Sequence, residues 1–335
     1  MTPFLLSQDN LVLLLEELSQ NLEVIAPVLA EGEPVFATWK GQPLALDKEN
    51  PLNSPAEFFL PQRETLFRYV QYSGRYTFEE DPPKSRLILG MRPCDVQAIR
   101  VLDQIFGSGP ADLPYVNKRK STIIVALNCT KPQETCFCAQ MGAGPRSEVG
   151  YDLLFTEIEQ GYVVESGTPA GMFILKYYSH LFEEALPEHL EEMETRLRDA
   201  ENAVRKNRPD MSAESILQAA ENVDLDRAEK ECLQCGGCSL VCPICHCFST
   251  MDQGVPDGER IRCRDSCVLA GFSRMTGGAN PRETLGKRQL HWYLDKFVYI
   301  PEKTGMLGCV GCGRCSKVCL GKVDRWKLLE EAMRR

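Results

Sequence analysis

Apolar residues at helical spacing mark the beginning of the chain. Leu11, Leu14, Leu15 and Leu18 recur three and four positions apart, which predicts an amphipathic helix. Ser7 stands where the N-cap of that helix is expected, because a serine hydroxyl accepts hydrogen bonds from the free backbone N–H groups of the first turn. Polar segments that contain Pro and Gly follow to about residue 60.

Two short apolar runs flank a segment with helical periodicity. Residues 86–90 and 122–127 read as buried strands, and the segment 96–106 between them has the periodicity of a helix with Asp95 as its N-cap. A strand–helix–strand unit with apolar strands indicates a parallel α/β layer. Functional groups in such layers gather beyond the carboxyl ends of the strands.

A charged stretch from 187 to 208 carries an apolar seam with steps of three and four residues. The seam consists of Leu190, Met193, Leu197, Ala200 and Val204. It predicts a long helix that packs along one face, either within its own domain or against a partner subunit. A short basic helix is expected at the C-terminus, from Asp324 to Arg335.

Composition limits the class of protein. With 335 residues, 43% of them hydrophobic and 25% charged, the chain suits a globular protein of two domains. A basic leader and an apolar run of membrane-spanning length are both missing from the sequence, so a cytoplasmic protein without membrane insertion is expected. The net charge of −9 argues against nucleic acid as a partner.

Cysteines supply the candidate chemistry. Twelve of the sixteen lie between residues 232 and 319, and eight of these form two copies of Cys-x2-Cys-x2-Cys-x3-Cys. In bacterial ferredoxins three thiolates of such a run bind one 4Fe–4S cluster, and the fourth binds the other. The first cluster is therefore expected on Cys232, Cys235, Cys238 and Cys319. The second is expected on Cys309, Cys312, Cys315 and Cys242.

Zinc sites and disulfides are the alternatives to this interpretation. Zinc modules usually need only paired Cys or Cys and His, and disulfide frameworks suit short secreted chains. The repeated four-cysteine run favours two 4Fe–4S clusters. We therefore expect an α/β domain at 1–220, followed by a small α+β dicluster ferredoxin domain of the bacterial type at 221–335, with an insert at about 244–305.

The other eight cysteines form two sets. One set lies around the predicted α/β layer: Cys94, Cys129, Cys136 and Cys138. Cys94 and Cys129 follow the two strands directly, so these thiols could hold a third 4Fe–4S cluster; the alternative is a catalytic thiol among inert, buried cysteines. The other set lies in the insert: Cys245, Cys247, Cys263 and Cys267. Its members are either extra ligands or, as we favour, sulfurs that pack around the existing clusters.

Several phrases resemble one known family. They are Ser54-Pro-Ala-Glu-Phe-Phe-Leu-Pro61, Gly90-Met-Arg-Pro-Cys94-Asp95, Asn128-Cys129 with Thr135-Cys136-Phe-Cys138, Asp265-Ser-Cys267 and Gly308-Cys309-Val-Gly-Cys312-Gly-Arg-Cys315. They are similar to phrases in the beta subunits of cytoplasmic sulfhydrogenases and in the A subunit of anaerobic sulfite reductase. Ala56 stands where that family would have Lys, and Leu320 where a ferredoxin run usually has Pro.

The resemblance implies an electron-transfer subunit without catalytic residues of its own. FAD would reside on a flavoprotein partner that exchanges hydride with NAD(P)H, and a terminal redox subunit would serve a reaction of hydrogen, sulfite, polysulfide or a heterodisulfide. A second hypothesis makes the chain a flavin-binding catalytic beta subunit, although it contains neither Gly-x-Gly-x-x-Gly nor a Walker A phrase. A third is a zinc module without redox function.

Overall fold

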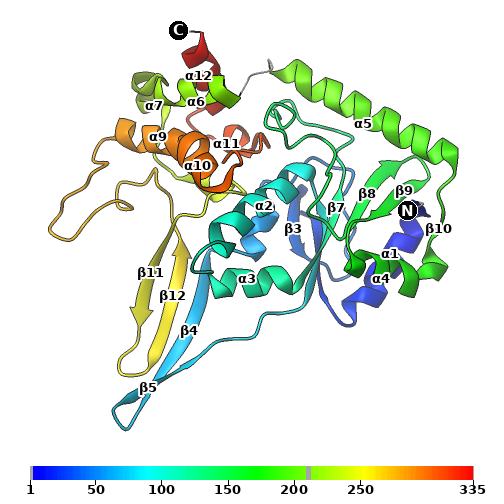
Figure 1. Ribbon diagram of the computed structural model, residues 1–335, viewed down its shortest axis with the longest axis horizontal. Coiled ribbons are helices and arrows are strands. Elements are labelled where there is room, and N and C mark those ends of the chain that lie inside the picture. The colour runs from blue at the N-terminus through cyan, green and yellow to red at the C-terminus, as the bar shows by residue number, and fades with distance from the viewer. Residues whose placement is uncertain (1–2, 209–212, 335) are drawn as a thin grey trace.

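A computed structural model describes residues 3–208 and 213–334. The chain forms a large sheet with helices on both faces, a second sheet, and a group of short helices near the C-terminus (Figure 1). The elements up to residue 207, apart from two strands of the second sheet, are β1 (Phe4–Leu6), α1 (Gln8–Ser19), β2 (Glu23–Ala30), β3 (Glu33–Thr38), η1 (Pro55–Phe58), β6 (Arg86–Met91), α2 (Pro93–Gly107), α3 (Leu113–Lys120), β7 (Thr122–Leu127), β8 (Leu153–Ile158), β9 (Gly161–Ser166), α4 (Pro169–Tyr177), η2 (Ser179–Leu181), β10 (Glu183–Glu184) and α5 (Pro187–Asn207).

The large sheet has the strand order β10-β1-β9-β8-β7-β6-β2-β3 within the described residues. Its four central strands β2, β6, β7 and β8 run parallel, and the outer strands pair antiparallel. The two strands predicted at 86–90 and 122–127 are β6 and β7, which lie side by side at the centre. The predicted α/β layer is thus confirmed.

Helices cover both faces of this sheet. The leucines of α1 pack with α4 on one face, and the apolar side chains of α2 and α3 pack on the other. Met193 and Leu197 of α5 contact Val163 of β9, so α5 extends the second face. The predicted cap of α1 is confirmed, because the Ser7 hydroxyl accepts a hydrogen bond from the backbone N–H of Asn10 at 3.2 Å.

The predicted start of α2 is wrong. The helix begins at Pro93 and its N-cap is Arg92, so Asp95 lies inside the first turn. Pro93 explains the earlier start, because its ring fixes φ near the helical value and its missing N–H costs nothing at that position. Asp95 is completely buried and has a different role, described below.

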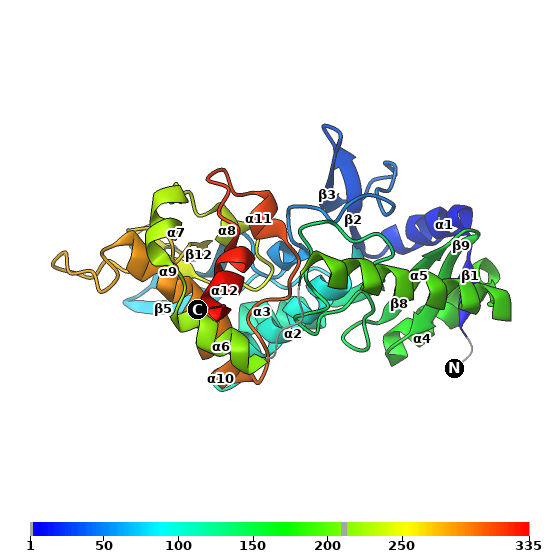
Figure 2. The same ribbon diagram turned by 90° about the horizontal axis from the view of Figure 1, so that it is seen from above.

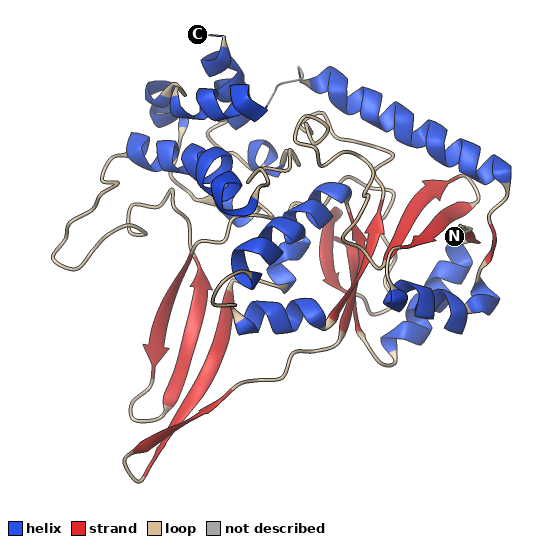
Figure 3. Cartoon of the chain, viewed as in Figure 1, coloured by secondary structure: helices blue, strands red, loops and turns tan. Residues whose placement is uncertain are grey.

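The second sheet joins segments that are far apart in the chain. Its order is β11 (Phe248–Gln253), β12 (Gly258–Arg264), β4 (Arg63–Tyr72) and β5 (Arg75–Glu79), all antiparallel. Figure 3 shows these strands extending away from the rest of the molecule. At its base Arg262 is buried in ion pairs with Glu64 and Asp112. These ion pairs therefore join residues of the two domains that the sequence predicts at 1–220 and 221–335.

The C-terminal region consists mainly of short helices. They are α6 (Ala213–Glu221), α7 (Leu225–Glu231), α8 (Gly237–Leu240), α9 (Leu285–Leu294), the π-helical turn η3 (Asp295–Tyr299), α10 (Ile300–Thr304), α11 (Arg314–Lys317) and α12 (Arg325–Met333). Trp292, Tyr293 and Trp326 form the centre of their common core, together with α6. Seen from above, these helices lie at the opposite end of the molecule from α1 and α4 (Figure 2).

The predicted C-terminal helix is α12. Asp324 caps it, because its carboxylate accepts hydrogen bonds from the backbone N–H groups of Trp326 and Lys327, both at 3.1 Å. Arg335, the last residue of the predicted helix, lies outside the described residues. None of the described helices is both long enough and apolar enough to cross a membrane.

Candidate metal centres

The two cysteine runs adopt the same backbone conformation. Gly236 and Gly313 have φ of 73° in both cases, and each caps a four-residue helix that carries the third cysteine of its run. The helices are α8, with Cys238, and α11, with Cys315, and they lie against each other. The fourth cysteine follows the end of each helix by two residues. The sequence repeat is therefore also a structural repeat.

The first predicted group of thiols lies around the contact between the two runs. Gln289 donates to Cys232 Sγ at 3.0 Å, and Arg325 donates to Cys238 Sγ at 3.1 Å. A Cβ on Gly237 would lie 3.6 Å from Cys235 Sγ and 3.8 Å from Val318, the residue before Cys319. The Sγ atom of Cys319 accepts a hydrogen bond from the backbone N–H of Val323 at 3.2 Å.

The second predicted group is more deeply buried. Burial is the main cause that raises the pKa of Cys309, Cys312 and Cys315, and the neighbouring Cys242 raises each of these pKa values further. Cys242 comes from the first run, so the structure brings the fourth cysteine of that run to the three thiols of the other run. This exchange is what the ferredoxin spacing predicts.

Buried thiols of this kind are poor ligands until a positive centre is near. Burial raises the pKa of Cys309 to about 12, and it raises the pKa of Cys136 in the N-terminal part to about 12 as well. The thiolate is the form that binds metals, so bound iron would have to supply the charge that stabilises it.

The four N-terminal cysteines line one pocket at the carboxyl ends of the strands. Cys94 lies in the first turn of α2 after β6, and Cys129 follows β7 by two residues. Cys136 and Cys138 come from the next loop and face the same pocket, whose wall also includes Cys312 of the second run. The predicted third site therefore lies directly beside the second group of thiols.

Backbone packing fixes the distance between these two sites. The N–H of Phe137 donates to the carbonyl oxygen of Gly311 at 2.8 Å, and Cys136 Sγ donates to the carbonyl oxygen of Cys312 at 3.8 Å. A Cβ on Gly311 would lie 2.5 Å from the backbone of Phe137, which real Cβ atoms do not approach. Only glycine allows the two loops to pack so closely at this positive φ.

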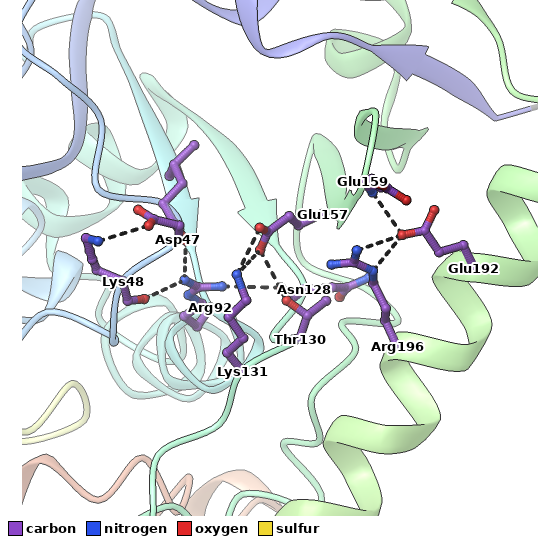
Figure 4. Close-up of polar contacts among 11 residues, drawn as sticks. Asp47, Lys48, Arg92, Asn128, Thr130, Lys131, Glu157, Glu159, Glu192 and Arg196 are labelled. Atoms are coloured by element: carbon purple, nitrogen blue, oxygen red, sulfur yellow. Dashed lines mark hydrogen bonds and ion pairs between the residues drawn. The ribbon is translucent and has the colours of Figure 1, made fainter.

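A polar frame holds the loop that carries Cys129 (Figure 4). The Arg92 guanidinium donates to the carbonyl oxygens of Leu46 at 2.7 Å and Asn128 at 3.3 Å, and the Lys131 ammonium pairs with Glu157 at 3.0 Å. Asn128 is completely buried, and its side-chain oxygen accepts a hydrogen bond from the N–H of Ser147 at 3.0 Å. These contacts fix the position of the loop without using a cysteine.

The four cysteines of the insert do not form a single group. Cys245 shares a hydrogen bond with Cys242, which lowers the pKa of Cys242, and Cys247 shares one with Cys267. Cys263 lies on β12 opposite Ser249, and none of the hydrogen bonds among the described residues joins it to another cysteine. Cys245 therefore lies beside Cys242 of the second group, Cys267 lies near Cys245, and Cys247 lies beside Cys267.

Sequence reasoning missed the polar residues that contact these sulfurs. Asn50 donates to Cys94 Sγ at 3.7 Å, and Arg314 forms a bidentate pair with Asp95, next to Cys94. Gln289 and Arg325 lie in helices, where such side chains are usually exposed, so only their burial at 0% and 6% reveals them. The Gly313-Arg-Cys315 phrase is part of the recognised cysteine run, but nothing in the sequence indicates that its arginine pairs with Asp95.

These surroundings fit iron–sulfur clusters. Cluster sulfurs accept N–H hydrogen bonds, and here backbone, amide and guanidinium N–H groups already point at cysteine sulfurs. The indole N–H of Trp292, in the same core, is buried and has no acceptor among the described residues. No three Cys, His, Asp or Glu side chains of the described ranges converge as ligands of one metal ion would.

Comparisons with known proteins agree with this geometry. Residues 231–323 match the protein family described as 4Fe-4S dicluster domain. The chain is also similar to sulfhydrogenase 2 subunit beta of Pyrococcus furiosus, with 31% identity over 292 residues. That similarity covers 86% of this chain and 85% of the relative.

Proposed function

Because the chain belongs to the family of sulfhydrogenase beta subunits and contains a 4Fe–4S dicluster domain, we propose that it is the electron-relay subunit of a cytoplasmic multi-subunit oxidoreductase. The family membership makes it an iron–sulfur protein of electron transfer and a member of a complex of several subunits. A 4Fe–4S cluster, when bound, accepts and releases single electrons. The proposal concerns how many clusters this chain holds and which partners it serves.

The exchange of the fourth cysteine between the two runs carries the proposal. Cys242 lies beside Cys309, Cys312 and Cys315, and Val318, the residue before Cys319, lies against Gly237 of the first run. Two clusters bound in this way share one compact frame, in which helices α8 and α11 touch. Such a frame suits the passage of single electrons between neighbouring centres.

A third cluster on Cys94, Cys129, Cys136 and Cys138 is part of the proposal. All four line one pocket, and the loop of Cys136 packs backbone to backbone against the loop of Cys312. The order of the sites would then run from the α/β sheet through the second group of thiols to the first group. Cys245, Cys247 and Cys267 would surround the second group without being required as ligands.

The partners follow from the role of a relay. We propose a flavoprotein subunit that carries FAD and reacts with NAD(P)H, and a terminal redox subunit that acts on hydrogen or on an oxidised sulfur compound. The flavin would exchange electron pairs with NAD(P)H, and this chain would carry single electrons between the flavin and the terminal subunit. In this arrangement the residues of this chain bind the clusters, exclude water from them and hold their ligands, and none of them acts on substrate.

An anaerobic count of iron, sulfide and flavin on the purified chain tests the proposal. Three clusters correspond to about twelve iron and twelve sulfide ions per chain, and two clusters correspond to about eight of each. We expect about twelve, with no stoichiometric FAD. About eight would remove the third cluster alone.

Two other results would overturn the relay itself. Stoichiometric FAD on the isolated chain would favour a flavin-binding catalytic beta subunit. Zinc in place of iron and sulfide would show a module without redox function.

A further inference from the structure

Three buried side chains form a stripe along the helix near the end of the insert. Gln289 and Trp292 lie in α9, and Lys296 lies in the π-helical turn η3 that continues it. Their spacing of three and four residues places them on one face. They are 0%, 3% and 1% exposed, so this face is entirely inside the protein.

One end of the stripe contacts the first group of thiols. Gln289 donates to Cys232 Sγ, and its side-chain oxygen accepts a hydrogen bond from Arg325 at 2.7 Å. The same guanidinium donates to Cys238 Sγ and lies 4.1 Å from the centre of the Trp292 ring. The cation at this end is therefore directly bonded to a ligand sulfur.

The other end contacts the second group of thiols through Lys296. Its ammonium donates to the carbonyl oxygen of Gly308 at 3.2 Å, and the N–H of Gly308 donates back to the carbonyl oxygen of Lys296 at 2.7 Å. Gly308 immediately precedes Cys309, so these two bonds attach the cation to the loop that carries three of the thiols. The ammonium also lies 5.4 Å from the centre of the Trp292 ring.

Lys296 has no carboxylate partner. Within the part of the chain that the structure describes, no Asp or Glu oxygen comes within ion-pair distance of its ammonium. Burial by itself lowers the pKa of Lys296, but Cys242 and Cys245, followed by Asp295 and Cys309, raise it well above the ordinary value. Arg314 provides the contrast, because Asp95 neutralises that buried cation. Sulfurs of Cys242, Cys245 and Cys309 are therefore among the groups closest to this charge.

We propose that Lys296 sets the reduction potential of the cluster held by Cys242, Cys309, Cys312 and Cys315. The inference rests on the proposed function, since it needs that cluster. Reduction adds one electron and no proton moves, so the site becomes more negative by one charge while Lys296 stays protonated. A buried cation stabilises the more negative state, and neither water nor salt screens it effectively at this depth. Lys296 thereby raises the potential of this cluster above the value that it would have without the charge.

Removal of the charge tests this role. In the complete chain, purified with its clusters, Lys296→Met should lower the potential of one cluster in a redox titration followed by electron paramagnetic resonance. We expect its ratio of reduced to oxidised form at a fixed potential to fall at least tenfold, which equals about 59 mV for a one-electron couple. Lys296→Arg, which keeps the charge, should restore most of the difference.

Lys287→Met is the matched control. Lys287 lies on the same helix, but its side chain is 53% exposed and pairs with Glu283, so its removal should leave both potentials unchanged. Lys296→Gln keeps a donor for the carbonyl oxygen of Gly308 and serves as a second neutral variant. Iron and sulfide are counted in every variant.

The results separate the two proposals. Wild-type protein without iron and sulfide would end the proposed function. Full clusters with an unchanged potential in Lys296→Met, or an equal shift in Lys287→Met, would overturn only the role of Lys296. Loss of iron from both neutral variants would overturn it as well, because the lysine would then serve assembly of the site.

Discussion

Arg314 and Asp95 form a bidentate ion pair that joins the two halves of the chain. The guanidinium of Arg314, in α11, contacts both carboxylate oxygens of Asp95, in α2, at 2.6 and 2.9 Å. Both side chains are completely enclosed, with 2% and 0% of their surfaces exposed. A third bond runs from Arg314 Nε to the carbonyl oxygen of Pro51 at 2.7 Å, so the cation has a partner on each side.

Breaking this pair from one side should destabilise the protein strongly. Asp95→Asn leaves the guanidinium buried without a counter-charge, and such single removals cost about 3–5 kcal/mol. The thermal midpoint, measured without oxygen, should fall accordingly. Glu283→Gln breaks the exposed pair with Lys287 and should cost less than about 1 kcal/mol. An equal fall of the thermal midpoint in the two variants would show that the buried pair stabilises the protein no more than the exposed pair does.

Replacing Gly313 by Ala should damage the contact between the two cysteine loops. A Cβ at this position would lie 2.5 Å from the carbonyl oxygen of Thr135, in addition to the strain of a positive φ. Gly305 has nearly the same φ, 72° against 73°, but open space around it, so Gly305→Ala measures the strain alone, about 1 kcal/mol. We expect a larger fall of the thermal midpoint in Gly313→Ala than in Gly305→Ala, and reduced iron content in Gly313→Ala only. Similar behaviour of both variants would contradict close packing at the interface.

Iron content distinguishes a third cluster from a set of inert thiols. Cys129→Ala should lower the iron of the purified chain by about four ions, because a lost ligand releases a whole cluster. Cys263→Ala is the control, since Cys263 is bonded to no other cysteine in the described structure and should leave the count unchanged. An unchanged count in Cys129→Ala would exclude this residue as a ligand.

Alkaline pH should weaken the α/β region in part through Tyr162. Burial and the charge of Glu157 together raise the pKa of Tyr162 from 10.0 to about 12, although Arg92 acts in the opposite direction. The folded protein therefore keeps the neutral phenol to a higher pH than the unfolded chain does. The stabilisation is complete below pH 10 and is lost as the pH rises towards 12, by an amount on the order of 2 kcal/mol.

Tyr162→Phe tests that pH dependence. The variant should show a smaller fall in thermal midpoint between about pH 9 and about pH 11 than the unchanged protein. A fall of the same size in both would mean that Tyr162 does not titrate differently in the folded and unfolded states.

Local sequence patterns predicted the helices and strands whose apolar periodicity is contained within their own residues. The leucines of α1, the apolar runs of β6 and β7 and the seam of α5 each show their buried face directly in the sequence. Strand β2 is different, because it contains Pro27, which is rare inside strands, and the segment after it is rich in turn residues. Its place in the sheet depends on β3 and β6, which lie beside it only in the folded chain.

The candidate site divides in the same way. Cysteine spacing alone predicts which thiols bind the same cluster, because the spacing itself is the geometric requirement of the cluster. The neighbours of the thiols have no such spacing. Lys296 follows Asp295 in a helix that reads as amphipathic, and its burial results from α9 and η3 packing in the core that cysteines of both runs contact. The pairing of β4 with β12 likewise has no local signal, since it depends on residues almost 200 positions apart.

That long separation has a consequence for synthesis on the ribosome. Glu64 and its partner Arg262 are 198 positions apart, so at about 5–20 residues per second β4 waits roughly 10–40 s for β12. During this time the newly made hairpin of β4 and β5 presents an open edge to every other nascent chain. Glu79 and Glu80 stand at the end of β5, and their negative charges would discourage mispairing until the correct strand arrives.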